Sequence, residues 1–266
     1  MRRETLMKTL SKIFAAIALT VAVQAAAADF TSAEQAHAAI KKLDTAIAKD
    51  SRKAANWVQR GDAYYALNDM SRAIEDYSRA IKLDPSNDAA FFGRGMARGR
   101  TGQLDEGIAD LSVFLARNPN SSLGYTKRGV RHIWNNNLPA AESDLERAIE
   151  LDSNNAEAHD DLGVVYAKQN RIREAAKHFS TAIALDPTYQ KAFHNLAICY
   201  HVSGAHGLAL STVDESLKLN PNHRGSVLLK AAVLSAMGKK SEAAALTEQA
   251  EFLPEENWTE RTSLTK

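Results

Sequence analysis

Arginine and aspartate recur at a fixed interval in this sequence. These charged residues could bind an anion or pair with one another. Successive arginines lie 34 residues apart, and an aspartate follows each by 16 residues, which gives the pairs Arg60 and Asp76, Arg94 and Asp110, and Arg128 and Asp144. A guanidinium offers several N–H donors to an anion, so a row of arginines suggests an anion site. Further basic residues nearby would strengthen such a site: Arg98, Arg100, Lys127 and Arg131.

The aspartates favour a second interpretation. At the next three 34-residue steps the arginine becomes Leu162, Leu196 and Lys230, while the aspartate becomes His178, Thr212 and Leu246. Arginine and aspartate therefore appear together and disappear together. A half-buried guanidinium needs a partner for its charge, and a carboxylate can accept two hydrogen bonds from it. We predict three structural Arg–Asp pairs that replace leucine packing, and the anion site stays an open alternative.

The remaining candidates for chemistry are the histidines and the single cysteine. His194 and His201 are seven residues apart, which is about 10 Å along a helix and too far to share one metal ion. Cys199 lies between Ile198 and Tyr200, where a packed, inert thiol is expected. The sequence contains no G-x-S-x-G, H-E-x-x-H or phosphate-loop motif. We expect no enzyme, no metal and no cofactor, and a small-ligand or metal receptor is kept as an alternative.

A longer phrase shares the 34-residue period. "YSRAIKLDP" begins at Tyr77, "LERAIELDS" at Leu145 and "FSTAIALDP" at Phe179. With Ala54 as position 1, six units follow without insertion or deletion: 54–87, 88–121, 122–155, 156–189, 190–223 and 224–257. Such a period predicts a stacked array, because one unit cannot bury its apolar face alone.

Each unit shows helical apolar spacing twice, with a break that contains Gly or Asn, as at Asn68 and Gly102. We therefore predict two antiparallel helices per unit. Small residues at positions 8, 20 and 27 would let two helix backbones approach closely. Proline at position 32 would end the second helix and help to begin the next unit; it is found as Pro85, Pro119, Pro187 and Pro221.

These columns resemble the tetratricopeptide repeat, whose signature is Trp-x2-Leu-Gly-x2-Tyr, then Ala-x3-Phe, then Ala and Pro. The first unit matches it with Trp57, Gly61, Tyr64, Ala73, Tyr77, Ala80 and Pro85. The fourth unit matches it with Leu162, Gly163, Tyr166, Ala175, Phe179, Ala182 and Pro187. The resemblance covers residues 54–257 and implies an all-α, right-handed α-solenoid of six 34-residue helix-turn-helix repeats.

The two ends of the chain differ from the repeats. Residues 1–28 combine a basic start, an apolar run and a small-residue end, as a secretory signal peptide does, with cleavage after Ala25 or Ala28 and with Met1 or Met7 as the true start. Residues 29–53 should hold a capping helix, at about 33–50, and residues 258–266 a tail that includes Trp258. We expect no membrane span after the leader is removed.

Charge argues against nucleic acid as a partner. The whole chain has 33 Lys and Arg against 32 Asp and Glu, and residues 1–28 hold four of the former and one of the latter, so the rest carries a net charge of about −2. The style of the leader and the lack of disulfides predict a periplasmic protein of a Gram-negative bacterium.

The resemblance also implies where a protein partner would bind. In this family the first helices line a concave groove, and that groove holds a peptide segment or a partner's helix. The corresponding apolar positions are Val58, Tyr65, Phe92, Met96, Val130, Ile133, Trp134 and Ile198. We predict an interaction scaffold there, with the alternatives that some of these residues pack against neighbouring helices or that the repeats assemble with other copies. The clamp for chaperone C-termini is not expected, because no unit has Lys at position 5 with Asn at position 9.

Overall fold

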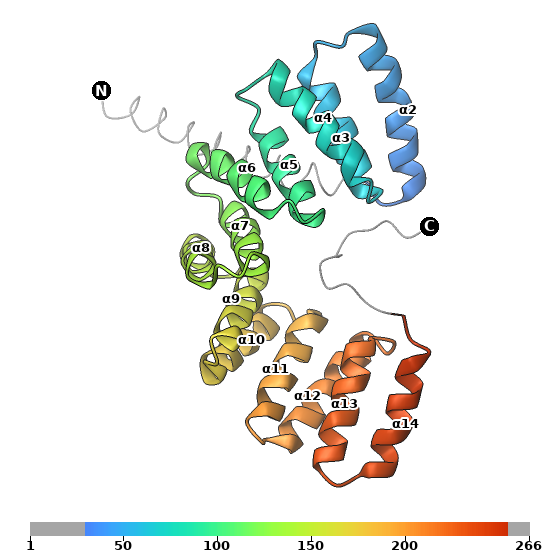
Figure 1. Ribbon diagram of the computed structural model, residues 1–266, viewed down its shortest axis with the longest axis vertical. Helices are drawn as coiled ribbons and strands as arrows, with labels where there is room; N and C mark the ends of the chain where they lie inside the picture. Colours follow the sequence, from blue (N-terminus) through green and yellow to red (C-terminus); the bar gives the residue numbers. More distant parts are fainter. Residues whose placement is uncertain (1–29, 255–266) are drawn as a thin grey trace, which may run out of the picture. The chain divides into compact units, whose positions relative to one another are not determined.

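The computed structural model describes residues 30–254, and this part of the chain is all-α, with thirteen helices and no strand (Figure 1). The predicted leader and the predicted tail, with Trp258, lie outside the described residues. Helices α2 to α6 form one compact unit and helices α7 to α14 a second. No helix in residues 30–254 is both long and apolar enough to cross a membrane.

The helices follow the 34-residue period. After α2 (Ala33–Lys49) come six pairs, whose first helices are α3 (Ala54–Ala66), α5 (Asp88–Arg100), α7 (Ser122–Trp134), α9 (Ala156–Lys168), α11 (Gln190–Val202) and α13 (Arg224–Ala236). Their second helices are α4 (Met70–Leu83), α6 (Leu104–Arg117), α8 (Leu138–Leu151), α10 (Ile172–Leu185), α12 (His206–Leu219) and α14 (Lys240–Glu251). Every first helix thus begins at position 1 of a predicted unit.

Helix α2 lies where the sequence predicts a capping helix. Ser32 caps its first turn, because the Ser32 hydroxyl accepts a hydrogen bond from the Gln35 amide. Its buried residues are Ala36, Leu43 and Ile47, and it packs against α3. Helix α2 therefore covers the apolar side of the first pair.

The turn within each pair is made in the same way. Position 15 has a left-handed backbone in all six pairs, with φ between 55° and 81°, and the residues there are Asn68, Gly102, Asn136, Asn170, Gly204 and Gly238. Glycine and asparagine tolerate this conformation better than other residues do. The Asn- or Gly-containing breaks in the sequence therefore set the reversal of the chain between the two helices.

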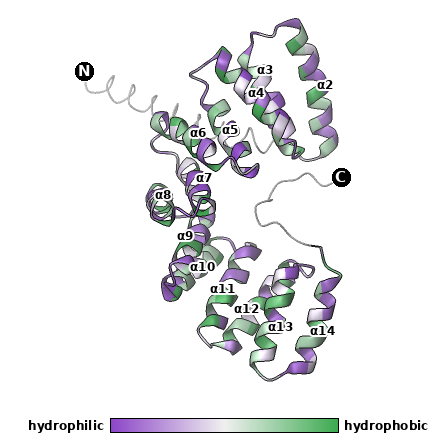
Figure 2. Ribbon diagram, in the orientation of Figure 1, coloured by the Kyte–Doolittle hydropathy of each residue, from purple (hydrophilic) through white to green (hydrophobic). Residues whose placement is uncertain are grey.

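A side chain from the second helix fills the space above the glycine at position 8. A Cβ added to Gly61, Gly95, Gly129 or Gly163 would lie within 3.0 Å of the side chain at position 24 of the same unit. Those side chains are Tyr77, Leu111, Leu145 and Phe179, and all four are at most 2% exposed. Alanines at positions 20 and 27 are fully buried as well, as at Ala73 and Ala80. Small residues thus bring the two helices of a pair together, and the apolar residues of each helix gather on its packed side (Figure 2).

The contact between Gly163 and Phe179 can be tested by adding one methyl group. In Gly163→Ala the new Cβ would lie 2.7 Å from Phe179 Cε1, so the free energy of unfolding should fall by about 1–3 kcal/mol. Gly207→Ala is the matched control, because nothing lies within 4 Å of its Cβ, and it should leave stability equal or raise it by up to about 1 kcal/mol. Equal effects of the two substitutions in urea unfolding would contradict the contact.

Candidate functional site

The arginines and aspartates of the first three pairs meet in two-point contacts. Arg60 Nε and Nη2 donate to the two carboxylate oxygens of Asp76 at 2.7 and 2.8 Å. Arg94 makes the same contacts with Asp110 at 2.8 and 2.7 Å. Arg128 makes them with Asp144, also at 2.8 and 2.7 Å. The structure thus joins each arginine of a first helix to the aspartate that lies 16 residues later on the second helix.

These guanidinium groups are also covered by aromatic rings at position 4. Arg60 lies over Trp57, Arg94 over Phe91 and Arg128 over Tyr125, at 4.9, 5.7 and 5.7 Å from the ring centroids. The sequence analysis did not predict this third member, although an aromatic residue precedes each arginine by three places, which is nearly one helical turn.

The carboxylates favour the charged form of Arg60 and Arg128. Hydrogen bonding to Asp76 is the largest cause that raises the pKa of Arg60, and hydrogen bonding to Asp144 raises the pKa of Arg128. Arg60 also reaches Asp44 of α2 at 2.6 Å, and Asp110 accepts a further hydrogen bond from Arg98 at 2.7 Å. The guanidinium N–H groups that a bound anion would need therefore already donate to carboxylates of the protein. This favours the interpretation of the three arginines as members of structural pairs.

The residues of the predicted interaction face differ in how much of their surface is exposed to solvent. Val58, Phe92 and Ile133 are buried, at 7%, 8% and 6% exposed. The Phe92 ring packs against the Phe114 ring, with 5.0 Å between centroids. Tyr65, Met96, Val130 and Trp134 are half-buried, and Ile198 is 38% exposed. Burial makes Val58, Phe92 and Ile133 part of the packing, whereas Val130 and Ile198 reach solvent.

In the second unit, position 9 forms an accessible apolar column. Val130 of α7, Val164 of α9 and Ile198 of α11 occupy it, and Ala232 of α13 continues it as an exposed residue. Helices α7, α9, α11 and α13 contact one another in that order. We call Val130, Val164 and Ile198 the position-9 stripe.

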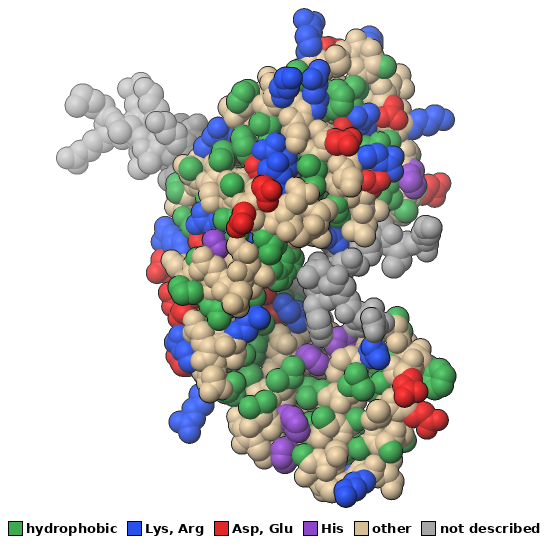
Figure 3. All heavy atoms as spheres, in the orientation of Figure 1, with side chains coloured by type: hydrophobic (Ala, Val, Ile, Leu, Met, Phe, Trp, Pro, Cys, Tyr) green, Lys and Arg blue, Asp and Glu red, His purple; other side chains and the backbone are tan. Residues whose placement is uncertain are grey.

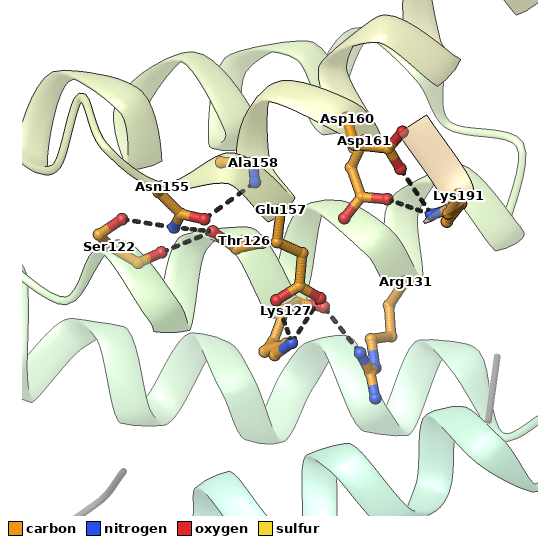
Figure 4. A network of polar contacts seen from close by, with 10 residues as sticks. All are labelled: Ser122, Thr126, Lys127, Arg131, Asn155, Glu157, Ala158, Asp160, Asp161 and Lys191. Atoms are coloured by element: carbon orange, nitrogen blue, oxygen red, sulfur yellow. Dashed lines mark hydrogen bonds and ion pairs between the residues drawn. The ribbon is translucent and has the colours of Figure 1, made fainter. Parts of the chain in front are cut away.

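Ion pairs join successive first helices of the second unit (Figure 4). Lys127 Nζ donates to both carboxylate oxygens of Glu157, at 2.5 and 2.7 Å. Thirty-four residues later the charges are exchanged: Lys191 Nζ lies 2.9 Å from Asp160 Oδ2 and 3.1 Å from Asp161 Oδ1. The contacts of Lys127 with Glu157 and of Asp161 with Lys191 each join position 6 of one repeat to position 2 of the next, whereas Asp160 reaches Lys191 from position 5. Positions 2, 6 and 9 share one face of a helix. The sequence analysis missed this ladder, whose signal is an opposite charge 30 residues away.

Asp160 and Asp161 share a single ammonium group. Asp160 is fully buried and Asp161 is 5% exposed, while Asn195 donates to Asp160 at 3.0 Å. Burial is the largest cause that raises the pKa of Asp161, and Lys191 opposes it. The two carboxylates in turn hold the pKa of Lys191 above its usual range, against the effect of burial. This part of the ladder is a fixed element of the second unit, because its charged groups are paired inside the protein.

Family profiles match three stretches of the chain. A profile described as a TPR repeat matches residues 61–102, and two described as tetratricopeptide repeats match residues 89–121 and 156–189. The chain is a tetratricopeptide repeat protein. No curated protein matches the sequence.

Solved tetratricopeptide structures share the fold at low sequence identity. A chain of the APC/C hetero-tetramer Cut9–Hcn1 has a TM-score of 0.69 and 20% identity over 82% of this chain, which spans only 45% of that chain's length. PilW, described as a type IV pilus biogenesis factor, has a TM-score of 0.69 and 20% identity over 74% of this chain and 92% of its own. YrrB, described as having an unusual peptide-binding site, has a TM-score of 0.54 and 23% identity over 70% of this chain and 95% of its own.

The fourth and fifth repeats hold six of the eight histidines, and several histidines reach the surface of the second unit (Figure 3). His194 and His201 do not share a site, because His194 packs on His223 and His201 packs on His206, each with 5.2 Å between ring centroids. The Ser226 hydroxyl lies 2.9 Å from His194 Nδ1 and 2.7 Å from His223 Nδ1. His223 also caps α13, since its Nδ1 accepts from the Ser226 amide at 2.9 Å.

Burial lowers the pKa of both His194 and His223 to about 4, with the charge of His223 a lesser cause for His194. Cys199 is buried at 2% exposure, and burial raises the pKa of its thiol to about 11, so the packed, unreactive thiol that the sequence predicts is found.

The first prediction from this site concerns Arg94 and Asp110. Arg94→Leu introduces the residue that two later repeats carry, and it leaves Asp110 with Arg98, whereas Asp110→Ala leaves two guanidinium groups without their carboxylate. We expect Asp110→Ala to cost more, about 3–5 kcal/mol, and the pair to show a coupling energy of about 1–3 kcal/mol. Urea unfolding of the two single variants and the double variant measures this coupling. Strictly additive losses would exclude an energetic pair.

The second prediction concerns how the free energy of unfolding changes at acidic pH. An unfolded histidine takes up a proton near pH 6.5, whereas His194 and His223 do so only near pH 4 when folded. Between these values the unfolded state binds more protons, so the free energy of unfolding must fall as the pH falls, by about 2–4 kcal/mol from pH 7 to pH 5 for both residues. The Ser226 hydroxyl lies against both rings, and the groups in contact with it, Ser216 and Gln190, are neutral as well.

His223→Asn is the matched variant for this effect. Asparagine keeps an acceptor at the cap, as Asn87 and Asn155 do at the same position of earlier repeats, but it does not titrate. The dependence of unfolding free energy on pH near pH 5 should become shallower by about 1 kcal/mol per pH unit. An unchanged slope would show that His223 is not one of the titrating groups.

Proposed function

We propose that this tetratricopeptide protein is a non-catalytic interaction scaffold of the bacterial cell envelope, and that the first-helix face of its second unit holds a peptide segment or a helix of a partner protein. The observation that carries the proposal is the position-9 stripe. Its apolar side chains reach solvent on successive helices, beside an ion-pair ladder that fixes those helices to one another.

The chemistry of the stripe fits a protein partner better than a small ligand. Val130, Val164 and Ile198 offer apolar contact in a line, with one side chain from each repeat. An extended peptide or an amphipathic helix also presents apolar side chains at regular intervals. The neighbouring charges are largely paired within the protein, so binding would depend on apolar burial rather than on new ion pairs. Two fold relatives point the same way, since one belongs to an assembled complex and another is described with a peptide-binding site.

The envelope location rests on the sequence of the leader. The basic start, the apolar run and the small residues before Asp29 form the motif that directs export. The fold relative described as a pilus biogenesis factor supports an envelope role by analogy of fold alone.

The exposure pattern determines which substitutions test the proposal. Phe92→Glu would place a charge in a buried ring contact and would be expected to unfold the repeat. Val130→Glu with Ile198→Glu changes only accessible positions of the stripe. Leu208→Glu is the matched control, because Leu208 is 55% exposed but lies on α12, a second helix.

We expect proteins cross-linked in an envelope extract by the unaltered chain to be lost with Val130→Glu/Ile198→Glu and kept with Leu208→Glu. Circular dichroism must first show that all three proteins are equally helical. Equal capture by the stripe variant and the control would show that the partner binds elsewhere on the protein. A mass that grows with concentration, with no other protein captured, would replace the proposal with self-assembly.

A further inference from the structure

The fourth repeat carries a pair of histidines where the first three repeats carry an aromatic ring and an aspartate. His159 of α9 occupies position 4, and His178 of α10 occupies position 23. Their Nδ1 atoms are 3.1 Å apart, and their rings are stacked with 5.3 Å between centroids. Leu162 stands at position 7, so no arginine side chain enters between them as it does in the first three repeats. His178 has therefore replaced the aspartate, His159 the aromatic ring and Leu162 the arginine.

The protonation of His159 follows from its second contact. Its Nε2 lies 3.3 Å from the Ser153 carbonyl oxygen, which can only accept a hydrogen bond. Nε2 therefore carries the proton of the neutral ring, and Nδ1 presents its lone pair towards His178. A metal-bound imidazole almost always donates its far N–H to a carboxylate, a backbone carbonyl or water, and the Ser153 carbonyl is such a partner.

The distance between the two nitrogens suits a shared ion. Two imidazole nitrogens, each about 2.1 Å from one metal at the angles of an octahedral or tetrahedral ion, lie about 3.0–3.4 Å apart. Here the separation is 3.1 Å, within that range, and the rings need only turn so that both lone pairs converge on the ion. In the metal-free protein the same distance is bridged by His178 Nδ1–H donating to His159 Nδ1.

We propose that His159 and His178 form a binding site for a divalent transition metal of the copper or nickel type, coordinated through the two Nδ1 atoms. For this, the proton of His178 moves from Nδ1 to Nε2, so the ring stays neutral and no net proton is released. Imidazole suits these ions, and water completes the coordination.

The surroundings favour a modest site rather than a closed structural one. Glu174 lies one turn before His178, and its charge favours a positive charge there, but its carboxylate is held by Arg171 at 2.9 and 2.5 Å. Lys177 opposes a positive charge. His159 is at position 4, about half a turn around α9 from positions 2 and 6, so the metal site lies apart from the position-9 stripe.

The test uses the full-length chain with Ni²⁺ and Cu²⁺ as the probes. We expect one equivalent of Ni²⁺ to bind by calorimetry and to raise the Tm by about 3 °C at ten times its Kd, with reversal by a chelator. His159→Gln and His178→Gln should each abolish the bound equivalent and the rise in Tm. His201→Gln is the matched control, because it removes one ring from another close histidine pair and should bind as the unaltered chain does.

The outcomes separate the alternatives. Binding that survives both glutamine variants, that is lost in His201→Gln, or that is absent from the unaltered chain at millimolar ion would overturn the site. If a glutamine variant is less helical than the unaltered chain, the decision rests on the unaltered protein. There, Cu²⁺ at less than one equivalent should broaden the ring-proton NMR signals of His159 and His178 before those of the other six histidines. Broadening that begins at any other histidine would equally overturn the proposal.

Discussion

The structure depends on the close contact between the two helices of each repeat, where position 24 fills the space that position 8 leaves. Gly163 accommodates the Phe179 ring, and Gly95 accommodates Leu111. In the fifth repeat position 8 becomes Ala197, which adds a methyl group, and position 24 is the smaller Val213, still fully buried. The two positions thus change in opposite directions and conserve the volume of the contact. This constraint explains why the repeats keep a length of 34 residues. One extra residue between positions 8 and 24 would turn the side chain at position 24 away from position 8.

A second constraint acts at positions 4, 7 and 23, and it explains the polar groups inside the repeats. The first three repeats place an aromatic ring, an arginine and an aspartate there, as with Tyr125, Arg128 and Asp144. In these repeats the ring and the carboxylate together offset the cost of burying the guanidinium. Once leucine replaces the arginine, an aspartate would be left without its cation, so position 23 must change as well. The change to histidine in the fourth repeat keeps the position neutral, because burial lowers the pKa of His178 to about 4.

Much of the fold could be predicted from the sequence because its signals are repeated. One Gly or Asn in a break is weak evidence, but the residues at position 15 from Asn68 to Gly238 fall in one register. The pairing of arginine with aspartate could be predicted for the same reason, since both residues disappear together. The ion pairs between Lys127 and Glu157 and between Lys191 and Asp161 were missed because their charges are exchanged from one repeat to the next. The histidine contact at 3.1 Å occurs in a single repeat, so no column of the sequence could reveal it.

The face of a first helix was harder to predict than its existence, because helical periodicity does not distinguish solvent from a neighbouring repeat. Position 5 is buried wherever a later first helix packs beside it in the second unit, as at Asp160 and His194. Leu228 occupies the same position in the last described first helix and is 38% exposed. Position 9 is one turn further along and stays accessible in the second unit, as at Ile198. Apolar residues at position 5 therefore stabilise the stack, and those at position 9 remain available to a partner. The proposed binding surface therefore uses position 9, where a substitution does not disturb the packing.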